Sequence, residues 1–521
     1  MPKKEAAWTV MVYLAGDNNL TTECMFALTE MKKAALTNDV HVIAQFDPSD
    51  PYLPAHRYEI NLDTESLYCD IIDRAWYHKK KKEVYFKKES RKATSLAQLR
   101  RTAARKSDKT KLEKANLTDG KADRVISDDT DTGSPITLYN FISFCLEKYR
   151  ARRYMVVLSG HAGGTERDYL LKDESSAGSL TFNELKRVFK KIKKDRKDRP
   201  IDIIGMDNCL MSMGEICYEL RGLAEVVVGC ESFSPTSGWP YRPILERLCT
   251  EFACSELPDG LSVTAEAGKA IVEEYVNYYA TYWMAGLSVT QSALEVRKVE
   301  KLRFEVNELA EAMEQALKAE ASNGHQRGSF TDALLLAHWE AQSYNGEQFI
   351  DVFDFCDCLA KRIEPTSTIA NLCERMKDFI KDEFVLRSCY CGATYQYSYG
   401  VSLYFPWAKI ASSYWNLDFV KGTEERGWGS FLKAYTKLTR REARGLERAN
   451  GDETAPAEEE SNELVDHRMM NDRMMDDRMM NDRTGTTRIH SMRNPPDIFV
   501  PDECIKDRQN ALHSQKVLRS R

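Results

Sequence analysis

A histidine and a cysteine, each at the end of a short apolar run, are the side chains in this sequence best placed for chemistry. Residues 154–160 read Tyr-Met-Val-Val-Leu-Ser-Gly and are followed by His161, and residues 201–208 read Ile-Asp-Ile-Ile-Gly-Met-Asp-Asn and are followed by Cys209. A free thiol has a pKa of about 8.5 and is mostly protonated at neutral pH, so a nucleophilic cysteine needs a base. An imidazole can accept that proton and later return it to a leaving group. The pair is therefore typical of nucleophilic catalysis by cysteine.

The elements around these two residues alternate between strand and helix, which predicts a doubly wound, mostly parallel α/β sheet flanked by helices. The expected strands span residues 8–15, 40–46, 154–160, 201–206 and 225–230. The expected helices span residues 20–35, 136–149, 181–194 and 211–223. Chemistry in such sheets collects at the carboxyl ends of the strands, so we expect His161 and Cys209 at adjacent strand ends. The helix from residue 211 is expected to direct unpaired N–H groups and its positive end towards Cys209.

The chain divides into three predicted parts. Residues 1–260 form the catalytic α/β core, which a basic insertion at 77–125 interrupts. Residues 261–438 form a mainly helical C-terminal part of the same unit, with helices expected at 262–283, 296–319, 346–362 and 367–384 and strand-like runs at 287–294 and 399–405. Residues 439–521 are Arg-, Glu- and Asp-rich and carry a five-residue repeat that fits neither the helical nor the strand period, which predicts a disordered tail.

Charge and composition exclude several classes of protein. The formal net charge is −6, yet 16 Lys and Arg against 5 Asp and Glu lie between Lys79 and Lys121, so this insertion could bind a polyanion by charge neutralisation or simply be solvated. No apolar run approaches the roughly 20 residues of a membrane span. No export signal is recognised, so we expect a cytoplasmic protein with reduced thiols, although export without a signal peptide is not excluded. The nine histidines and fourteen cysteines show no zinc-ligand spacing, so no metal site is expected.

Several ordered segments of the sequence resemble the clostripain family of cysteine peptidases, which have a caspase-like fold. They are residues 8–20 (Trp-Thr-Val-Met-Val-Tyr-Leu-Ala-Gly-Asp-Asn-Asn-Leu), 154–164, 205–212 (Gly-Met-Asp-Asn-Cys-Leu-Met-Ser), 228–232, 238–241 and 400–406. Because these segments occur in order through most of the first 437 residues, the resemblance is specific.

The resemblance implies a catalytic dyad and a specificity. Cys209 would be the nucleophile and His161 the general base and acid. Asp207 matches an acidic position that the family associates with a basic P1 side chain, so protein or peptide substrates would be cut after Arg or Lys. The backbone N–H groups of Ala162 and Cys209 would form the oxyanion hole, although Ala162 stands where the family usually has glycine. No cofactor is required; the resemblance leaves calcium dependence open and no calcium site is identifiable.

The resemblance also implies a zymogen that cuts itself between His161 and Cys209. Lys172 is the preferred site, because the polar, Gly- and Ser-containing stretch around it is suited to an exposed loop, where cleavage is easiest. A single-chain enzyme that needs no cut is the alternative to this zymogen.

Asp17 and Asn18 follow the first strand, where a turn that satisfies its own backbone is at least as good an interpretation as a catalytic role.

Two other functions remain open at this point. The alanine at position 162 and the long added segments would also suit a catalytically weak peptidase homologue that acts as an interaction scaffold. The basic stretch between Lys79 and Lys121 would suit a polyanion-binding protein. The retention of both His161 and Cys209 favours the peptidase.

Overall fold

The computed structural model describes the chain in eight stretches. They are residues 5–50, 54–60, 66–74, 131–254, 256–281, 286–322, 328–346 and 348–449. The basic insertion at 77–125 and the repeats of the tail lie outside the described residues. A helix continues to Ala449, beyond residue 438, after which the sequence predicted a disordered tail.

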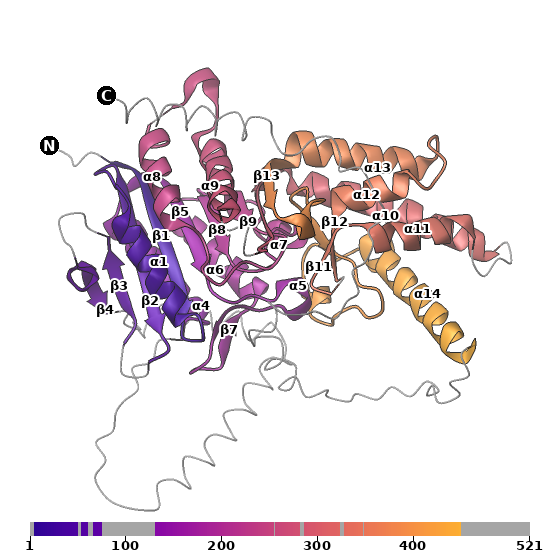
Figure 1. Cartoon of the computed structure of the whole chain (residues 1–521), viewed down its shortest axis with the longest axis horizontal. Helices are drawn as coiled ribbons and strands as arrows, with labels where there is room; N and C mark the ends of the chain where they lie inside the picture. The colour runs from indigo at the N-terminus through magenta and orange to yellow at the C-terminus, as the bar shows by residue number, and fades with distance from the viewer. Residues whose placement is uncertain are drawn as a thin grey trace, which may run out of the picture.

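A nine-stranded sheet forms the centre of the molecule, in the order β13-β10-β9-β8-β5-β1-β2-β3-β4 (Figure 1). Its strands are β1 (Ala6–Gly16), β2 (Val40–Pro48), β3 (His56–Glu59), β4 (Ile71–Arg74), β5 (Ala151–Ser159), β8 (Ile201–Asp207), β9 (Ala224–Gly229), β10 (Val289–Glu295) and β13 (Val385–Cys391). The five central strands β2, β1, β5, β8 and β9 run parallel, and the strands at both edges are antiparallel. The predicted mostly parallel α/β sheet is confirmed.

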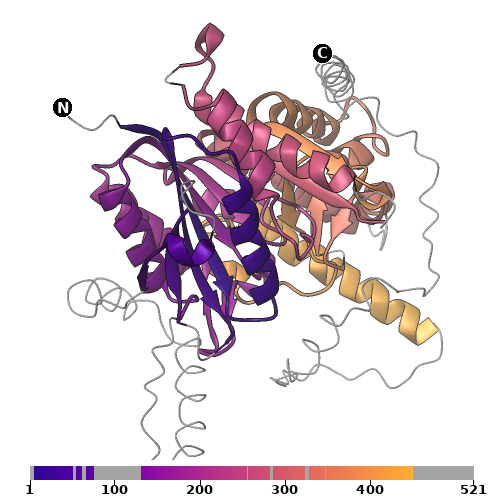
Figure 2. The same cartoon turned by 60° about the vertical axis from the view of Figure 1, so that its left-hand side comes forward.

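Helices cover both faces of this sheet and bury two separate apolar cores (Figure 2). One face carries α1 (Thr21–Lys33), α8 (Tyr241–Glu251) and α9 (Val263–Ala280); the other carries α4 (Pro135–Lys148), α6 (Phe182–Asp195) and α7 (Gly214–Glu219). The start of α6 shows why the sequence folds this way locally. Thr181 and Glu184 form a capping box that satisfies two N–H groups at the helix N-terminus.

The C-terminal part is mainly helical, and its helix α10 packs against α7 of the core. Its helices are α10 (Val299–Ser322), α11 (Ser329–Glu340), α12 (Val352–Ala360), α13 (Thr368–Phe379) and α14 (Trp428–Ala449), with a small sheet of β11 (Ser343–Tyr344), β12 (Phe349–Asp351) and β14 (Ser402–Tyr404). The division expected at residue 260 does not coincide with an end of the central sheet. Two strands of this part extend the sheet beyond β9: β10 pairs antiparallel with β9, and β13 pairs antiparallel with β10.

The strand order creates a switch point between β1 and β5. From β1 the chain forms β2 on one side, and β5, β8 and β9 then follow on the other. A ligand in an open α/β sheet binds beyond the carboxyl ends of the strands at such a point. Between β5 and α6 the chain forms the short helix α5 (Gly164–Arg167) and the hairpin of β6 (Leu170–Asp173) and β7 (Gly178–Leu180). None of the helices in the described stretches is long and apolar enough to cross a membrane.

Candidate active site

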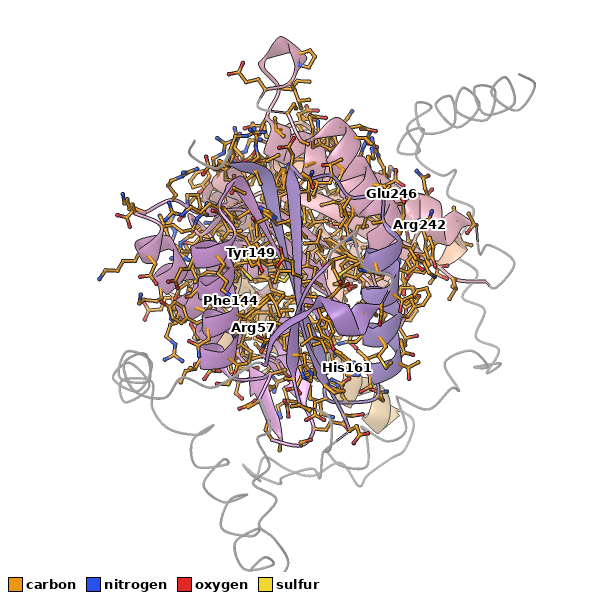
Figure 3. All side chains as sticks on the ribbon, turned by 90° about the vertical axis from the view of Figure 1, so that its left-hand side faces the viewer. Arg57, Phe144, Tyr149, His161, Arg242 and Glu246 are labelled. Atoms are coloured by element: carbon orange, nitrogen blue, oxygen red, sulfur yellow. The ribbon has the colours of Figure 1, made fainter. Side chains whose placement is uncertain are left out.

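The carboxyl ends of β5 and β8 bring the two predicted catalytic residues to the same edge of the sheet. Ser159 pairs with Asp207 across these parallel strands. His161 and Cys209 each follow two residues later, and Figure 3 shows His161 at the lower end of the sheet. The side chain of Asn208 donates a hydrogen bond of 2.5 Å to the carbonyl of Gly160, which holds the two strand ends together.

The backbone after Cys209 differs from the expected helix. A helix forms within the predicted range 211–223, but α7 spans only Gly214–Glu219, so the predicted start at residue 211 was wrong and the positive end of the helix is not at the thiol. The N–H groups of Leu210 and Met211 donate instead to the carbonyls of Ser232 and Cys230, at 3.0 and 2.8 Å. These bonds tie the turn to the segment after β9. Leu210 takes a left-handed conformation with φ of 60°, a costly geometry for a branched side chain.

The Cys209 thiol lies against the segment that follows β9. Its Sγ accepts a hydrogen bond from the N–H of Ser234 at 3.4 Å. Burial raises the pKa of this thiol to about 11, although the Ser234 N–H opposes that shift. A thiol with this pKa is neutral at pH 7, so a base must take its proton before it can attack. Sequence reasoning did not single out Ser234, which carries no signal beyond its place in a Ser-Phe-Ser-Pro loop.

His161 is hydrogen-bonded at the end of β1. Its Nε2 lies 2.6 Å from Oδ1 of Asn19, and its carbonyl accepts the N–H of Leu171 at 2.8 Å. Burial lowers the pKa of His161, the nearby Lys172 lowers it further, and Glu174 opposes the shift. The imidazole is therefore neutral at pH 7. In this structure it is not hydrogen-bonded to Cys209.

Ala162 follows His161 and forms an isolated antiparallel β-bridge. It pairs with Leu170, and the neighbouring Gly163 donates its N–H to the carbonyl of Tyr169 at 3.1 Å. Ala162 does not have a positive φ, so its methyl group causes no strain at the position where the family usually has glycine. Within the described residues, the N–H groups of Ala162 and Cys209 donate no hydrogen bond to the protein. Both donors are available for a ligand oxygen.

Asp207 is a buried carboxylate on β8, two residues before Cys209. Its Oδ2 accepts hydrogen bonds from Ser159 Oγ at 2.9 Å and from Tyr241 Oη at 2.8 Å. Its Oδ1 is buried and accepts no hydrogen bond of ordinary geometry. Burial raises the pKa of this carboxyl to about 6, opposed by the hydroxyls of Tyr241 and Ser159 and by the N–H of Trp239. An acceptor oxygen without a donor is suited to a cationic partner.

The expected processing site does not lie in an exposed loop. Lys172 is part of strand β6, and its carbonyl accepts the side-chain N–H of Asn18 at 2.8 Å. Asp173 is fully buried and accepts hydrogen bonds from the N–H and Oγ1 of Thr132. The exposed turn begins only at Glu174, whose N–H donates to the carbonyl of Asp17. The apolar pair before Lys172 packs into the core, and this packing draws Lys172 into the hairpin.

Asn18 fulfils the structural role expected of the turn after β1. Its Nδ2 also donates to the carbonyl of Ala15 at 3.0 Å, and its Oδ1 accepts the N–H of Leu20 at 2.9 Å. The residue that sequence reasoning missed is the next one, Asn19, whose side chain contacts His161. The only signal for it was its position at a strand end.

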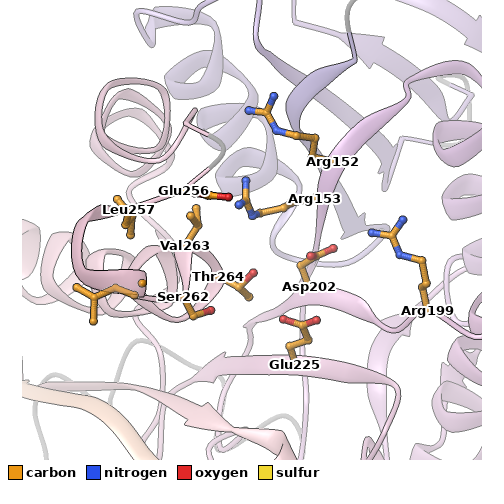
Figure 4. Close-up of a pocket in the computed structure, with 12 residues that line it drawn as sticks. Arg152, Arg153, Arg199, Asp202, Glu225, Glu256, Leu257, Ser262, Val263 and Thr264 are labelled. Atoms are coloured by element: carbon orange, nitrogen blue, oxygen red, sulfur yellow. The ribbon is translucent and has the colours of Figure 1, made fainter.

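A polar cavity of about 580 Å³ lies at the opposite end of the sheet. Arg152, Asp202 and Glu225, at the amino ends of β5, β8 and β9, line it together with Arg153 (Figure 4). Because His161 and Cys209 lie at the carboxyl ends, this cavity is separate from the candidate active site. Among the described side chains, no group of three His, Cys, Asp or Glu is arranged to hold a metal ion.

Comparisons with known proteins identify the family to which the chain belongs. The sequence profile of the clostripain family matches residues 12–435. Clostripain from Hathewaya histolytica is 22% identical over 394 residues, which cover 68% of this chain and 65% of clostripain, a little under two thirds of its length.

Two solved structures share the fold. An inactive zymogen C11 protease from Parabacteroides distasonis has a TM-score of 0.50 at 17% identity and covers 81% of this chain and 99% of its own. A secreted C11 cysteine protease from Bacteroides thetaiotaomicron, solved with an irreversible peptide inhibitor, has a TM-score of 0.50 at 16% identity and covers 80% and 98%. Because the family profile spans most of the chain, this protein belongs to the clostripain family of cysteine peptidases.

Proposed function

We propose that this protein is a cysteine endopeptidase that cleaves after Arg or Lys, with Cys209 as nucleophile and His161 as general base and acid. The observation that carries the proposal is the in-register pairing of Ser159 with Asp207, because it sets the two reactive residues at equal positions beyond adjacent strands. Family membership and the peptide inhibitor bound to the Bacteroides relative support a peptide substrate.

The reaction begins with transfer of the Cys209 proton to His161. The thiolate then attacks the scissile carbonyl, and the N–H groups of Ala162 and Cys209 stabilise the oxyanion. The imidazolium returns the proton to the leaving amine, which departs as the thioester forms. Water, deprotonated by the same imidazole, hydrolyses the thioester and restores the thiol. Cys209 and His161 are not hydrogen-bonded to each other in this structure, so binding of substrate must bring the thiol and the imidazole into contact.

Specificity for a basic P1 side chain is proposed to come from Asp207. A guanidinium or ammonium would donate to its unpaired Oδ1, whereas a neutral side chain would leave that buried oxygen without a partner. Ser159 and Tyr241 hold the other oxygen and so fix the direction of the carboxylate.

Self-cleavage at Lys172 is proposed as a slow, intermolecular event. The Lys172–Asp173 bond is held in the hairpin by the contacts of both residues, so the hairpin must open before this bond can enter an active site. Binding of polyanions by the residues between Lys79 and Lys121 has no support from the described part of the chain.

The test uses the full-length protein and a peptide-based covalent inhibitor with Lys or Arg at P1. Labelling and hydrolysis should occur with the wild type and disappear in Cys209→Ala. Cys254→Ala is the matched control, because Cys254 is another half-buried thiol and lies near Arg153 at the opposite end of the sheet. Hydrolysis by Cys209→Ala, or labelling that is lost in Cys254→Ala instead, would overturn the proposal.

A further inference from the structure

The side chain of Asn19 reaches across the switch point of the sheet to His161. Asn19 follows β1 and His161 follows β5, two parallel neighbours that pair through Leu14 and Ser159 near their carboxyl ends. The 2.6 Å contact between Nε2 of His161 and Oδ1 of Asn19 is the one side-chain hydrogen bond that the imidazole makes within the described residues.

We propose that Asn19 is a positioning residue that keeps the proton of His161 on Nε2 and leaves Nδ1 as the acceptor for the Cys209 proton. This inference rests on the proposed peptidase function. A neutral imidazole carries one proton, and a carboxamide oxygen can only accept a hydrogen bond. The nitrogen that faces Oδ1 must therefore be the donor, and the other nitrogen is the base.

The turn that carries Asn19 is fixed on both sides. The side chain of Asn18 bonds to the carbonyls of Ala15 and Lys172 and to the N–H of Leu20. Thr21 Oγ1 donates to the carbonyl of Gly16 at 2.5 Å at the start of α1. With the backbone held before and after it, Asn19 presents its carboxamide from a rigid support, as the orientation of a catalytic group requires.

The neutral carboxamide is also chemically appropriate. His161 must be a neutral base before attack and a cationic acid afterwards, and its Nε2–H can remain bonded to Asn19 through both states. A carboxylate at position 19 would hold the same tautomer but would favour the imidazolium and raise the pKa of His161. Asn19 therefore orients the ring without adding charge, while burial and Lys172 keep the pKa of His161 low.

The kinetic test compares Asn19→Ala and Asn19→Asp with the matched control Asn38→Ala. Asn38 is an exposed asparagine before β2 that makes no side-chain hydrogen bond within the described residues. Asn19→Ala should lower kcat by about tenfold or more with little change in KM, a part of the roughly 10²–10⁴-fold that general acid–base catalysis supplies. Asn19→Asp should recover much of kcat and move the acid limb of the kcat/KM profile to higher pH. Asn38→Ala should match the wild type.

Wild-type kcat in Asn19→Ala, or an Asn19→Asp variant that is no better than Asn19→Ala and has an unshifted profile, would overturn the inference. A second readout does not depend on activity. In a Cys209→Ala background, ¹⁵N NMR of histidine-labelled protein should show His161 protonated on Nε2 at neutral pH, and Asn19→Ala should mix the two tautomers. His161→Gln assigns the signals. If the wild type hydrolyses no peptide the proposed function fails, while an unchanged tautomer in Asn19→Ala contradicts the role of Asn19 alone.

Discussion

The carboxyl groups of Glu231 and Asp351 lie against each other in the interior, at the junction between the segment after β9 and the C-terminal part. Oε2 of Glu231 accepts the N–H of Gly400 at 3.0 Å, and Oδ2 of Asp351 accepts the N–H of Tyr399 at 2.6 Å. Burial raises the pKa of both carboxyls, and a hydrogen bond between them keeps a proton in the pair. Glu231 lies three residues before Ser234, so the pair is at the start of the segment that contacts Cys209.

The pair makes the protein less stable as pH rises. A carboxyl whose folded pKa is raised keeps its proton in the native state after the unfolded chain has lost it at about pH 4, so the free energy of unfolding falls from there to the folded pKa. Glu231→Gln leaves one titrating group and a donor for Asp351. We expect it to reduce the loss of stability between pH 5 and pH 8 by about 1 kcal/mol or more, since one unit of pKa is worth about 1.4 kcal/mol.

Urea unfolding at pH 5 and pH 8 measures this difference. Glu383→Gln is the control, because Lys298 and Lys301 lower the pKa of the Glu383 carboxyl to about 2 and its titration lies below this window. An equal loss of stability in wild type and Glu231→Gln would contradict the shared proton.

Selectivity for basic substrates should depend on pH through Asp207. With its pKa raised to about 6, the carboxyl is charged at pH 7.5 and neutral at pH 5. The ratio of kcat/KM for Lys or Arg at P1 to kcat/KM for a neutral P1 should fall as pH decreases through about 6. Taking the ratio removes the titration of His161, which affects both substrates equally.

Asp207→Asn should give a low ratio that does not change with pH. Asp202→Asn is the matched control, because Asp202 is a buried carboxylate at the other end of β8 and should leave the ratio unchanged. A ratio that stays high in Asp207→Asn would assign the specificity to another residue.

The sequence predicted the parts of the site that depend on local patterns. Buried β-branched runs located β5 and β8, and their ends located His161 and Cys209, because parallel strands order their carboxyl ends along one edge. The helix expected from residue 211 begins only at Gly214, because the N–H groups of Leu210 and Met211 find acceptors in the segment after β9, which no local pattern reveals. The contact of Asn19 with His161 spans 142 residues and was invisible for the same reason.

The C-terminal part shows the same limit. Apolar spacing located α10 and α13 within a few residues. The helix expected from residue 346 begins at Val352 instead, since Phe349–Asp351 pairs with β14 and Asp351 then caps the helix. Pairing with a strand about 50 residues away overrode the local helical pattern.

Ala162→Gly tests whether the departure from the family pattern weakens the enzyme. The Ala162 backbone needs no positive φ, and its N–H keeps its position, so we expect kcat/KM within about threefold of wild type and a stability loss of about 1 kcal/mol from added backbone freedom. Steady-state kinetics and thermal unfolding measure both effects. A gain of about a hundredfold, the scale of one oxyanion donor, would show that alanine had disabled the site and would favour the scaffold alternative.

We expect self-cleavage at Lys172 to be intermolecular, because the contacts of Lys172 and Asp173 hold the scissile bond in the hairpin beside His161 and prevent it from extending across its own active site. We expect purified wild type to form fragments with a new N-terminus at Asp173, at a rate that rises with protein concentration. Inactive Cys209→Ala, mixed with a trace of wild type, should be cut at the same bond. Mass spectrometry of the mixture over time measures this cleavage. The double variant Cys209→Ala/Lys172→Gln should stay intact at this bond. The control double variant Cys209→Ala/Lys190→Gln, whose second change lies in helix α6, should be cut at this bond as before. A rate independent of concentration would indicate cleavage within one chain, and an uncut, fully active wild type would make the protein a single-chain enzyme.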